Sequence, residues 1–568
     1  MTGNRMKSFA SRYMNLKFLI YSIIGLILTV CIHPLQAQEI AEEEDGQILT
    51  GEIVIEKDRK LVLPQARKIY QKVTPPSSKP RVTSIPNNFR SFEFSPEVKL
   101  PSLRAASPKL DTDKDRQYNH YLKVGYGNFQ SPLAQADLGI YSDKTKILRA
   151  RLDHLSFGEG AKDGKNSASV FTRFGLNGKV IGDEVVFSAG VNYTLTTDYF
   201  YGYENGLDVD RSTIKHKYNF FDADMAIADA NDDNELDYSV SVRLESMKDN
   251  YAAKESAVII RPSFSISKSI YLDNEIVLSK YEQSAFDANR NFFRVNPYYA
   301  FGTEDLKMQL GFSFTSISKG GESFGSSVIL PYAKARYQVS KSISLYAKLD
   351  GGMQQNRYSD YAKENPYLLE DVLIQNSRVN YDFNAGTSIL PSSKVSLKAN
   401  VGLQSVRNFG MYFQSDVLDA TKFDLMYLGV NTKVFSLASD IQASFSEKHS
   451  AGLRAKLMSY SAKGVSDFYN LPTSEIEVYS SHKMLDKLKL EWGFNFLGGM
   501  KGEILSETPS TSTKLSAITD LHLNLDYQIN ERSSAFIQFD NLLNKNYERY
   551  FNYPMKGLQV KLGVGLRF

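Results

Sequence analysis

The chain has 568 residues, with 67 Lys and Arg against 64 Asp and Glu, which gives a formal net charge of +3 at pH 7. Such a small excess over this length gives no argument for a nucleic-acid partner. Cys31 is the only cysteine, which excludes an intramolecular disulfide and a multi-cysteine metal site. Beyond residue 37 there is no apolar run of about 18 residues or more, so a helical membrane protein is excluded as well.

The N-terminus has the pattern of a secretory signal peptide. Basic residues precede a mostly apolar run over 18–32, and Leu35-Gln36-Ala37 offers a small-residue cleavage site. We therefore expect residues 1–37 to be removed, so that the mature chain begins at Gln38 without a cysteine. Two alternatives stay open, namely a lipoprotein acylated at Cys31 and a retained N-terminal anchor.

Residues 38–116 form a second, proline-rich region. Eight of the 18 prolines lie here: Pro64, Pro75, Pro76, Pro80, Pro86, Pro96, Pro101 and Pro108. Because proline disrupts both helix interiors and strand ladders, we predict an irregular periplasmic or lumenal segment. Its acidic run Glu42–Asp45 is interpreted as the start of a solvated tail.

From residue 117 to 568 the pattern changes to strands with period-2 alternation. In 235–245 the apolar residues are Leu236, Tyr238, Val240, Val242 and Leu244, and charged or hydroxyl residues stand between them. Such alternation places the two sets on opposite faces of a strand. Charged residues on one face favour a water-filled lumen over a dry sandwich core, and 34 Tyr with 34 Phe suit aromatic girdles.

The predicted fold is therefore all-β, a transmembrane antiparallel up-and-down barrel of about 22 strands, within a range of about 16–24. The weak point of the count is 421–445, where two short strands or one long strand would fit. Long connections such as 202–213, 355–377, 413–421 and 544–556 alternate mostly with tight ones such as 230–234, 339–341 and 530–532. Up-and-down topology requires this alternation.

The last eleven residues carry the strongest signal. The even positions are all apolar: Leu558, Val560, Leu562, Val564, Leu566 and Phe568. A strand that ends on a terminal Phe resembles the closing strand of a bacterial outer-membrane barrel. The resemblance implies that these six residues form the signal read by the barrel-assembly machinery.

Two segments resemble TonB-dependent receptors. Asp540–Glu548 (DNLLNKNYE), followed by Tyr553-Pro554, is similar to the end of these receptors, and Tyr121–Leu133 (YLKVGYGNFQSPL) with Tyr201-Gly202-Tyr203 is similar to the barrel start of plugless relatives from Bacteroidetes. True receptors carry a folded plug of about 130 residues led by a TonB-contacting segment. Only 79 residues, 38–116, are available here, without a plug-like Arg-Gly motif. Energised import therefore does not carry over, and the involvement of TonB stays open.

No residue pattern predicts catalysis, a cofactor or a metal. The histidines His120, His154, His216, His449, His482 and His522 are scattered. The acidic segment 222–237 lacks the Gly and Glu of an EF-hand loop and is interpreted as an acidic turn. Residues 158–166 narrowly miss the phosphate-loop spacing and are interpreted as a glycine-rich loop. In 355–377, tyrosines and carboxylates suit either sugar or partner binding or, more simply, an aromatic girdle with a solvated tip.

These observations predict a bacterial outer-membrane protein that is not an enzyme. The leading hypothesis is a pore or transporter without a full plug domain, and the alternative is a non-transporting scaffold subunit of an outer-membrane complex. A wide barrel encloses a lumen, so something must fill it. The candidates are residues 38–116, inward-folded loops, or a periplasmic or surface protein partner. Outer-membrane lipids surround the barrel in every case.

Overall fold

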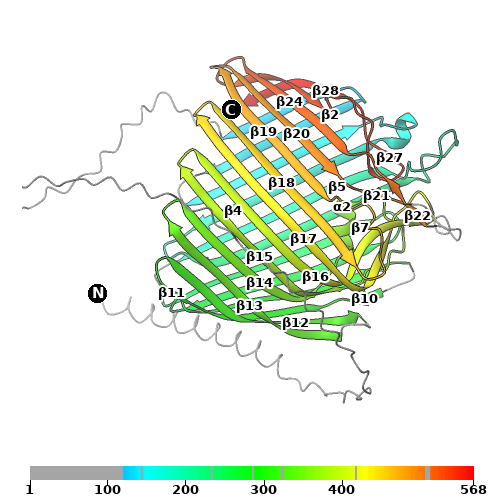
Figure 1. Ribbon diagram of the computed structural model, residues 1–568. Helices are drawn as coiled ribbons and strands as arrows, with labels where there is room; N and C mark the ends of the chain where they lie inside the picture. The colour runs from blue at the N-terminus through cyan, green and yellow to red at the C-terminus, as the bar shows by residue number, and fades with distance from the viewer. Residues whose placement is uncertain are drawn as a thin grey trace, which may run out of the picture. The chain divides into compact units, whose positions relative to one another are not determined.

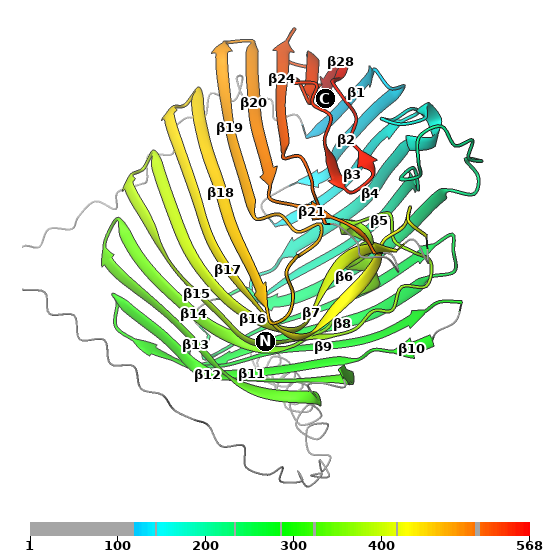
Figure 2. The same ribbon diagram turned by 45° about the vertical axis from the view of Figure 1, so that its right-hand side comes forward.

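The computed structural model describes residues 119–568, except 143–144, 232–233, 285–286, 322–324, 416–418 and 506–511. The predicted signal peptide, the alternatives at Cys31 and the proline-rich segment lie outside the described residues. Twenty-two antiparallel strands form one closed sheet, because the first strand pairs with both the second and the last. Figure 1 and Figure 2 show the tilted strands wound around the lumen. The predicted barrel of about 22 strands is confirmed.

The barrel strands follow one another around the sheet in chain order. They are β1 (His120–Gly127), β2 (Ser131–Ser142), β3 (Lys146–Phe157), β4 (Ser169–Ile181), β5 (Val185–Tyr199), β6 (Lys215–Asp229), β7 (Leu236–Asp249), β8 (Lys254–Ile266), β9 (Ile270–Glu282), β11 (Phe292–Gly302), β12 (Leu306–Gly321), β13 (Gly325–Ser340), β14 (Ile343–Gln354), β15 (Ser377–Ser392), β16 (Val395–Ser415), β17 (Asp424–Ser446), β18 (His449–Ala462), β19 (Ser474–Leu485), β20 (Leu488–Gly498), β24 (Ile518–Gln528), β25 (Ser533–Asp540) and β28 (Gln559–Arg567).

Smaller elements lie in the connections. They are η1 (Gly164–Ser167), β10 (Asp287–Asn289), α2 (Tyr358–Glu364), β21 (Lys501–Gly502), β22 (Ile504–Leu505), β23 (Thr513–Lys514), β26 (Glu548–Tyr550) and β27 (Tyr553–Pro554). Among the described residues, no helix is long and apolar enough to cross a membrane. The uncertain stretch 421–445 is one long strand, β17, rather than two short ones.

The period-2 pattern sets the two faces of the wall. On β28, Leu562, Val564 and Leu566 are all at least 40 % exposed and point outward, while the intervening Lys561 is buried. The same holds on β7, where Leu244 is 43 % exposed. A closed barrel with an apolar outer band satisfies all its backbone hydrogen bonds internally and is the form in which β-strands cross a membrane. The chain is thus a transmembrane barrel of the outer-membrane type.

The inward positions carry charge, as the alternation predicts. Ion pairs join neighbouring strands across the lumenal wall, among them Arg149–Asp137 at 3.0 Å, Arg261–Glu275 at 2.7 Å, Arg454–Glu477 at 2.8 Å and Lys561–Asp540 at 2.7 Å. Pairs that contact water contribute little stability, about 0–1 kcal/mol each. The ion pairs instead give the lumenal wall both positive and negative side chains, which face whatever occupies the lumen.

The two ends of the barrel differ. Turns are short at the end where β1 begins and β28 ends, such as 341–342 between β13 and β14 and 447–448 between β17 and β18, whereas the opposite end carries 200–214, 355–376 and 541–558. Barrels of this class have short periplasmic turns and longer outer loops. We therefore name the long-loop end the outer end and the short-turn end the periplasmic end.

Candidate functional site

Long loops at the outer end fold together into one buried cluster, which we name the outer cap. It consists of residues 355–376, with 200–214, 250–253, 419–423 and 547–554. Its core is aromatic and includes Phe200, Tyr201, Tyr358, Leu368, Phe423, Tyr550 and Tyr553, none more than 6 % exposed. Each large apolar side chain buried this fully contributes about 1.5–3 kcal/mol. The cap is therefore packed like the interior of a folded domain.

The central piece of the cap is the loop 355–376, which contains α2. Both of its ends are held by Arg290, which is 4 % exposed and donates 2.7 Å to the carbonyl of Asn356 and 2.5 Å to Oδ1 of Asn376. The first turn of α2 is fixed to the wall as well, because Glu255 accepts a hydrogen bond of 2.9 Å from the backbone N–H of Ser359.

Other loops meet this central piece from across the barrel. Residues 367–369 pair with Phe423 through two backbone hydrogen bonds of 2.8 Å, so the loop after β16 is joined to it as a strand-like bridge. From the last loop, Tyr550 donates 2.8 Å to the carbonyl of Glu364. Tyr553 stacks on Tyr367 with ring centroids 3.8 Å apart. The segments that meet here come from the middle and the end of the sequence.

The expectation of a girdle with a solvated tip is wrong for 355–377. Tyr358 and Leu368 are fully buried, and Tyr361 and Tyr367 pack against the same core. The physical reason is that partner loops supply apolar surface on both sides of the tyrosine rings. Burying the rings against this surface is therefore more favourable than leaving them exposed to solvent. The prediction of a long loop at this position is confirmed.

A cluster of charges strengthens the cap on one side. Lys422 is 15 % exposed, and its ammonium contacts Glu370 at 2.5 Å and Asp419 at 3.1 Å. Although burial favours neutral lysine, the two carboxylates outweigh it and raise the pKa of Lys422. Burial alone would raise the pKa of Asp419, but hydrogen bonds from Thr421 and the charge of Lys422 lower it. Burial raises the pKa of Tyr201 to about 12, so this cap tyrosine is neutral near pH 7.

A polar chamber lies beneath the cap. Arg357 at the start of α2 forms an ion pair with Glu245 on the wall and a second one of 3.2 Å with Asp360. These groups face a pocket of about 430 Å³ that is also lined by Arg261 and Glu275. Arginine and carboxylate are both present, so the chamber offers donors and acceptors rather than a single sign of charge. Sequence reasoning missed Arg290 and Arg357, because nothing local distinguishes them from other loop arginines.

The histidines have separate partners. His216 pairs with Asp249 at 3.2 Å, both side chains being fully buried, His154 contacts Thr172 at 2.8 Å, and His449 contacts His482 at 3.0 Å. His120 stacks on Phe568 at 5.2 Å, and His522 lies 3.5 Å from the amide of Asn495.

The acidic and glycine-rich segments were only partly interpreted correctly. Asp222 and Asp224 are not in a turn but on β6, facing the lumen, and only residues 230–235 connect β6 to β7. Within the described residues, no group of three or more His, Cys, Asp or Glu could hold a metal ion. Residues 158–166 do lie in the loop between β3 and β4, part of which is η1.

The predicted closing strand does close the barrel. β28 pairs with β25 on one side and with β1 on the other. Phe568 and His120 exchange two backbone hydrogen bonds of 3.1 Å. That Leu558, Val560, Leu562, Val564, Leu566 and Phe568 are read by the assembly machinery stays a prediction.

The chain matches no protein-family model and no curated protein sequence. Its likeness is to solved structures. The ferric-catecholate import receptor Fiu from Escherichia coli K12 has 11 % identity and a TM-score of 0.56, over 80 % of this chain and 82 % of that one. Pseudomonas aeruginosa FpvA, solved with heterologous pyoverdines, has 11 % identity and a TM-score of 0.59, over 79 % and 72 %.

A third neighbour is the FrpB iron transporter from Neisseria meningitidis, with 10 % identity and a TM-score of 0.58, over 80 % of this chain and 82 % of that chain. Identities this low establish the fold and leave ligand and mechanism open. The closed 22-strand barrel of this chain has the fold of solved siderophore receptors of the bacterial outer membrane.

Proposed function

We propose that the protein is an outer-membrane transporter-type barrel without a full plug domain, in which the outer cap gates a polar lumen. The observation that carries this proposal is the continuity between wall and cap. The charged inward face of β7, β8 and β9 reaches the underside of α2, where Arg357 and Glu245 are paired. A polar solute in the lumen would meet compensating donors and acceptors along its whole path.

The cap suits a gate because it is built from connecting segments, which pack against side chains of the wall strands such as Tyr218 and Tyr281. Residues 200–214, 355–376 and 419–423 lie between strands, so they could rearrange while the barrel ladder stays intact. The barrel strands are held by long antiparallel registers, such as fifteen residue pairs between β5 and β6. Loops are the part of a protein that opens at lowest cost. The neighbours Fiu and FrpB are described as an import receptor and an iron transporter, which supports the same class.

Single-channel conductance in planar bilayers tests the proposal. Three proteins are compared: the full-length chain, a deletion of 38–116, and a cap variant in which 358–371 is replaced by a Gly/Ser linker. The matched control replaces 303–305, an exposed turn between β11 and β12 that lies outside the cap, by the same kind of linker. Migration of unheated protein in detergent gels confirms that each barrel is folded.

A silent full-length protein beside a conducting cap variant would support the gate. Large conductance of the full-length protein would overturn it and indicate an open pore. Conductance of the 38–116 deletion alone would show that this segment, and not the cap, fills the passage. Silence of both variants, and of the two combined, would overturn transport altogether.

The depth of burial in the cap favours a second candidate, a non-transporting scaffold subunit. Phe200, Tyr358 and Phe423 are 0 % exposed, which is the packing of a permanent structure rather than of a flap. Such a scaffold would copurify with partner proteins in a near-fixed ratio and would stay silent in all the bilayer experiments. A transporter would purify alone.

A further inference from the structure

The outward face of four neighbouring strands carries a group of lysines at the outer end, which we name the lysine patch. Their inward neighbours fix the orientation. His216 and Tyr218 on β6 are fully buried under the cap, and Glu255 on β8 is 5 % exposed and bonded to α2. The residues that alternate with them on each strand therefore point away from the lumen. The patch consists of Lys215 and Lys217 on β6, Lys248 on β7, Lys254 on β8 and Lys280 on β9.

Strand register brings these lysines together on the wall. Lys248 stands directly opposite Lys254 on the next strand. On its other side Lys248 opposes Asn219, which lies two positions from Lys217 on β6. Like charges in directly opposite positions destabilise a sheet. An anionic group between the two opposed lysines would remove this repulsion.

Carboxylates compensate only part of the charge of the patch. Glu282 opposes Lys254 from β9, but its carboxylate contacts Lys280, which also pairs with Asp287 at 3.1 Å. The other four lysines of the patch are exposed and form no ion pair with a carboxylate within the described residues. The outward face here thus has five lysines against two acidic residues, and most of its positive charge is available to an anionic partner.

The depth of the patch matches the headgroups of the outer leaflet. On β7 the outward positions from Leu236 to Leu244 are apolar, and a strand needs about 9–11 residues to cross the apolar part of a membrane. Counted from Leu236, this length ends between Leu244 and Lys248. On β6 and β9, Phe221 and Leu278 are 41 % and 50 % exposed and continue the apolar band below the lysines. The patch therefore lies just beyond this band, on its outer side.

We propose that the lysine patch binds the phosphorylated headgroup of a glycolipid of the outer leaflet, whose acyl chains lie against the apolar band below. Lysine is a common ligand of phosphate, and clusters of basic residues beside a membrane span recognise anionic lipid headgroups. Lysine stems can cover apolar surface while the ammonium groups remain at headgroup depth. A lipid would gain both charge pairs and apolar contact, whereas a soluble anion would gain only the first. The site lies on the outside of the wall and does not depend on whether the cap gates transport.

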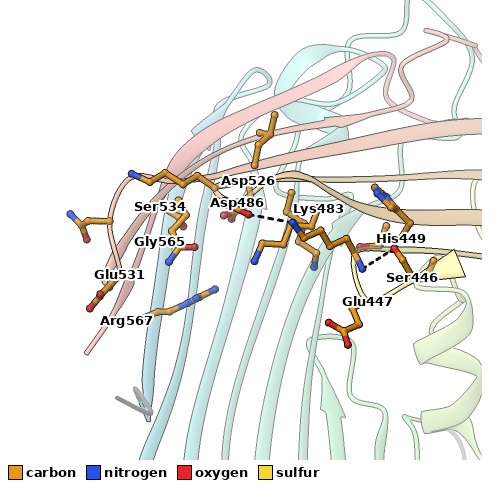
Figure 3. A pocket seen from close by; sticks show the side chains of 18 of the residues that line it. Ser446, Glu447, His449, Lys483, Asp486, Asp526, Glu531, Ser534, Gly565 and Arg567 are labelled. Carbon is orange, nitrogen blue, oxygen red and sulfur yellow. Dashed lines mark hydrogen bonds and ion pairs between the residues drawn. The ribbon is translucent and has the colours of Figure 1, made fainter. Parts of the chain in front are cut away.

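The lysines of the periplasmic end lie in a different setting and supply a control. A pocket of about 650 Å³ on the lumenal wall there is lined by basic residues together with acidic ones such as Asp486 and Asp526 (Figure 3). Lys448 in this pocket pairs with Asp486 at 3.3 Å. Lys394 of the same lining and Lys341 are exposed residues of short periplasmic turns. Replacing these two changes the net charge as much as replacing two lysines of the patch.

Native mass spectrometry of the full-length protein in a non-ionic detergent tests the proposal. The probes are bis-phosphorylated lipid A and the same lipid after removal of both phosphates, and inorganic phosphate serves as a competitor. The test variant is Lys248→Gln with Lys254→Gln, and the matched control is Lys341→Gln with Lys394→Gln. Migration of unheated protein in detergent gels confirms that each barrel is folded.

The bis-phosphorylated lipid should bind at least about tenfold more tightly than the dephosphorylated lipid, because a lysine beside an anionic headgroup strengthens binding by a factor of about five. For the same reason the test variant should lose about tenfold in affinity, and the control should stay within about twofold of the unmodified protein. Equal affinities for the two lipids, or equal losses in the two variants, would overturn the proposal. Displacement of the lipid by inorganic phosphate alone would overturn the assignment to a lipid and indicate a soluble phosphate ligand.

Discussion

Tyr367 and Tyr553 stack face to face in the outer cap, with ring centroids 3.8 Å apart and 25° between the planes. One residue belongs to the loop between β14 and β15, and the other to the loop between β25 and β28. The contact joins opposite parts of the chain above a lumen that the strands alone would leave open. Tyr553 also donates its hydroxyl proton to the carbonyl of Thr421. This pair is therefore the natural place to weaken the cap.

Tyr553→Ala should loosen the cap and leave the barrel intact. The substitution removes the stacked ring and a hydrogen bond from a site that is 1 % exposed, so it should cost about 3–5 kcal/mol of local stability. Hydrogen exchange across 355–376 should then accelerate, while exchange in β16 and β17 stays slow. Tyr553→Phe keeps the ring and should cost only about 1 kcal/mol. Unchanged exchange in the alanine variant would show that the stack does not hold the cap.

Acid should weaken the cap through Asp419. Its folded pKa is lowered by Thr421 and Lys422, despite burial, so the unfolded loop binds a proton more readily than the folded one. The stabilisation is present above the ordinary pKa of aspartate and is lost as the pH falls through the lowered folded value. Pepsin cleavage within the cap should rise over this acid range. Asp419→Asn should remove the dependence on pH, and a variant that keeps the full dependence would contradict the assignment.

Lys422→Met should weaken the same cluster at neutral pH. The substitution keeps the length of the side chain but leaves Glu370 and Asp419, which Lys422 contacts at 2.5 and 3.1 Å, without their cation. Because the group is half-buried by these neighbours, we expect a cost of about 1–2 kcal/mol, between exposed and buried pairs. Faster hydrogen exchange at 419–423 would report it. The control is Lys363→Met on α2, because this lysine is exposed and pairs with no carboxylate among the described residues.

A charge on the outer face should be far more costly than the same charge one residue further on. Leu403 is 44 % exposed and points outward from β16, whereas Gln404 points inward and opposes Asp382. Leu403→Arg should destabilise the barrel in lipid by about 2–4 kcal/mol, and Gln404→Arg should be close to neutral. Urea unfolding in liposomes measures both. Equal losses would contradict the assigned faces.

Phe568 should matter more for assembly in cells than for folding in detergent. Its ring stacks on His120 at 5.2 Å, so Phe568→Ala loses a modest contact at the seam of the barrel. If the terminal pattern is a recognition signal, the amount of folded barrel in the outer membrane should fall several-fold, while refolding in detergent changes little. His120→Ala loses the same stack but keeps the signal. Equal assembly defects in the two variants would indicate a structural role only.

The sequence by itself determined the barrel wall. Alternation along 235–245 and 558–568 is a local property, because successive side chains on a strand always point to opposite faces. The pattern therefore specified which residues, such as Leu244 and Leu562, meet lipid and which, such as Lys561, face the lumen. Strand number followed from the spacing of turns. The family resemblance of the closing strand rested on the same local pattern.

Only the tertiary structure decided what closes the ends. The local sequence around Tyr358 and Tyr367 would be the same whether these residues formed a girdle or a core. Their burial depends on Phe423 and Tyr553, which distant loops supply. These contacts join residues far apart in the sequence. Periodicity does not predict such contacts, since it indicates only the face of the strand on which a residue lies.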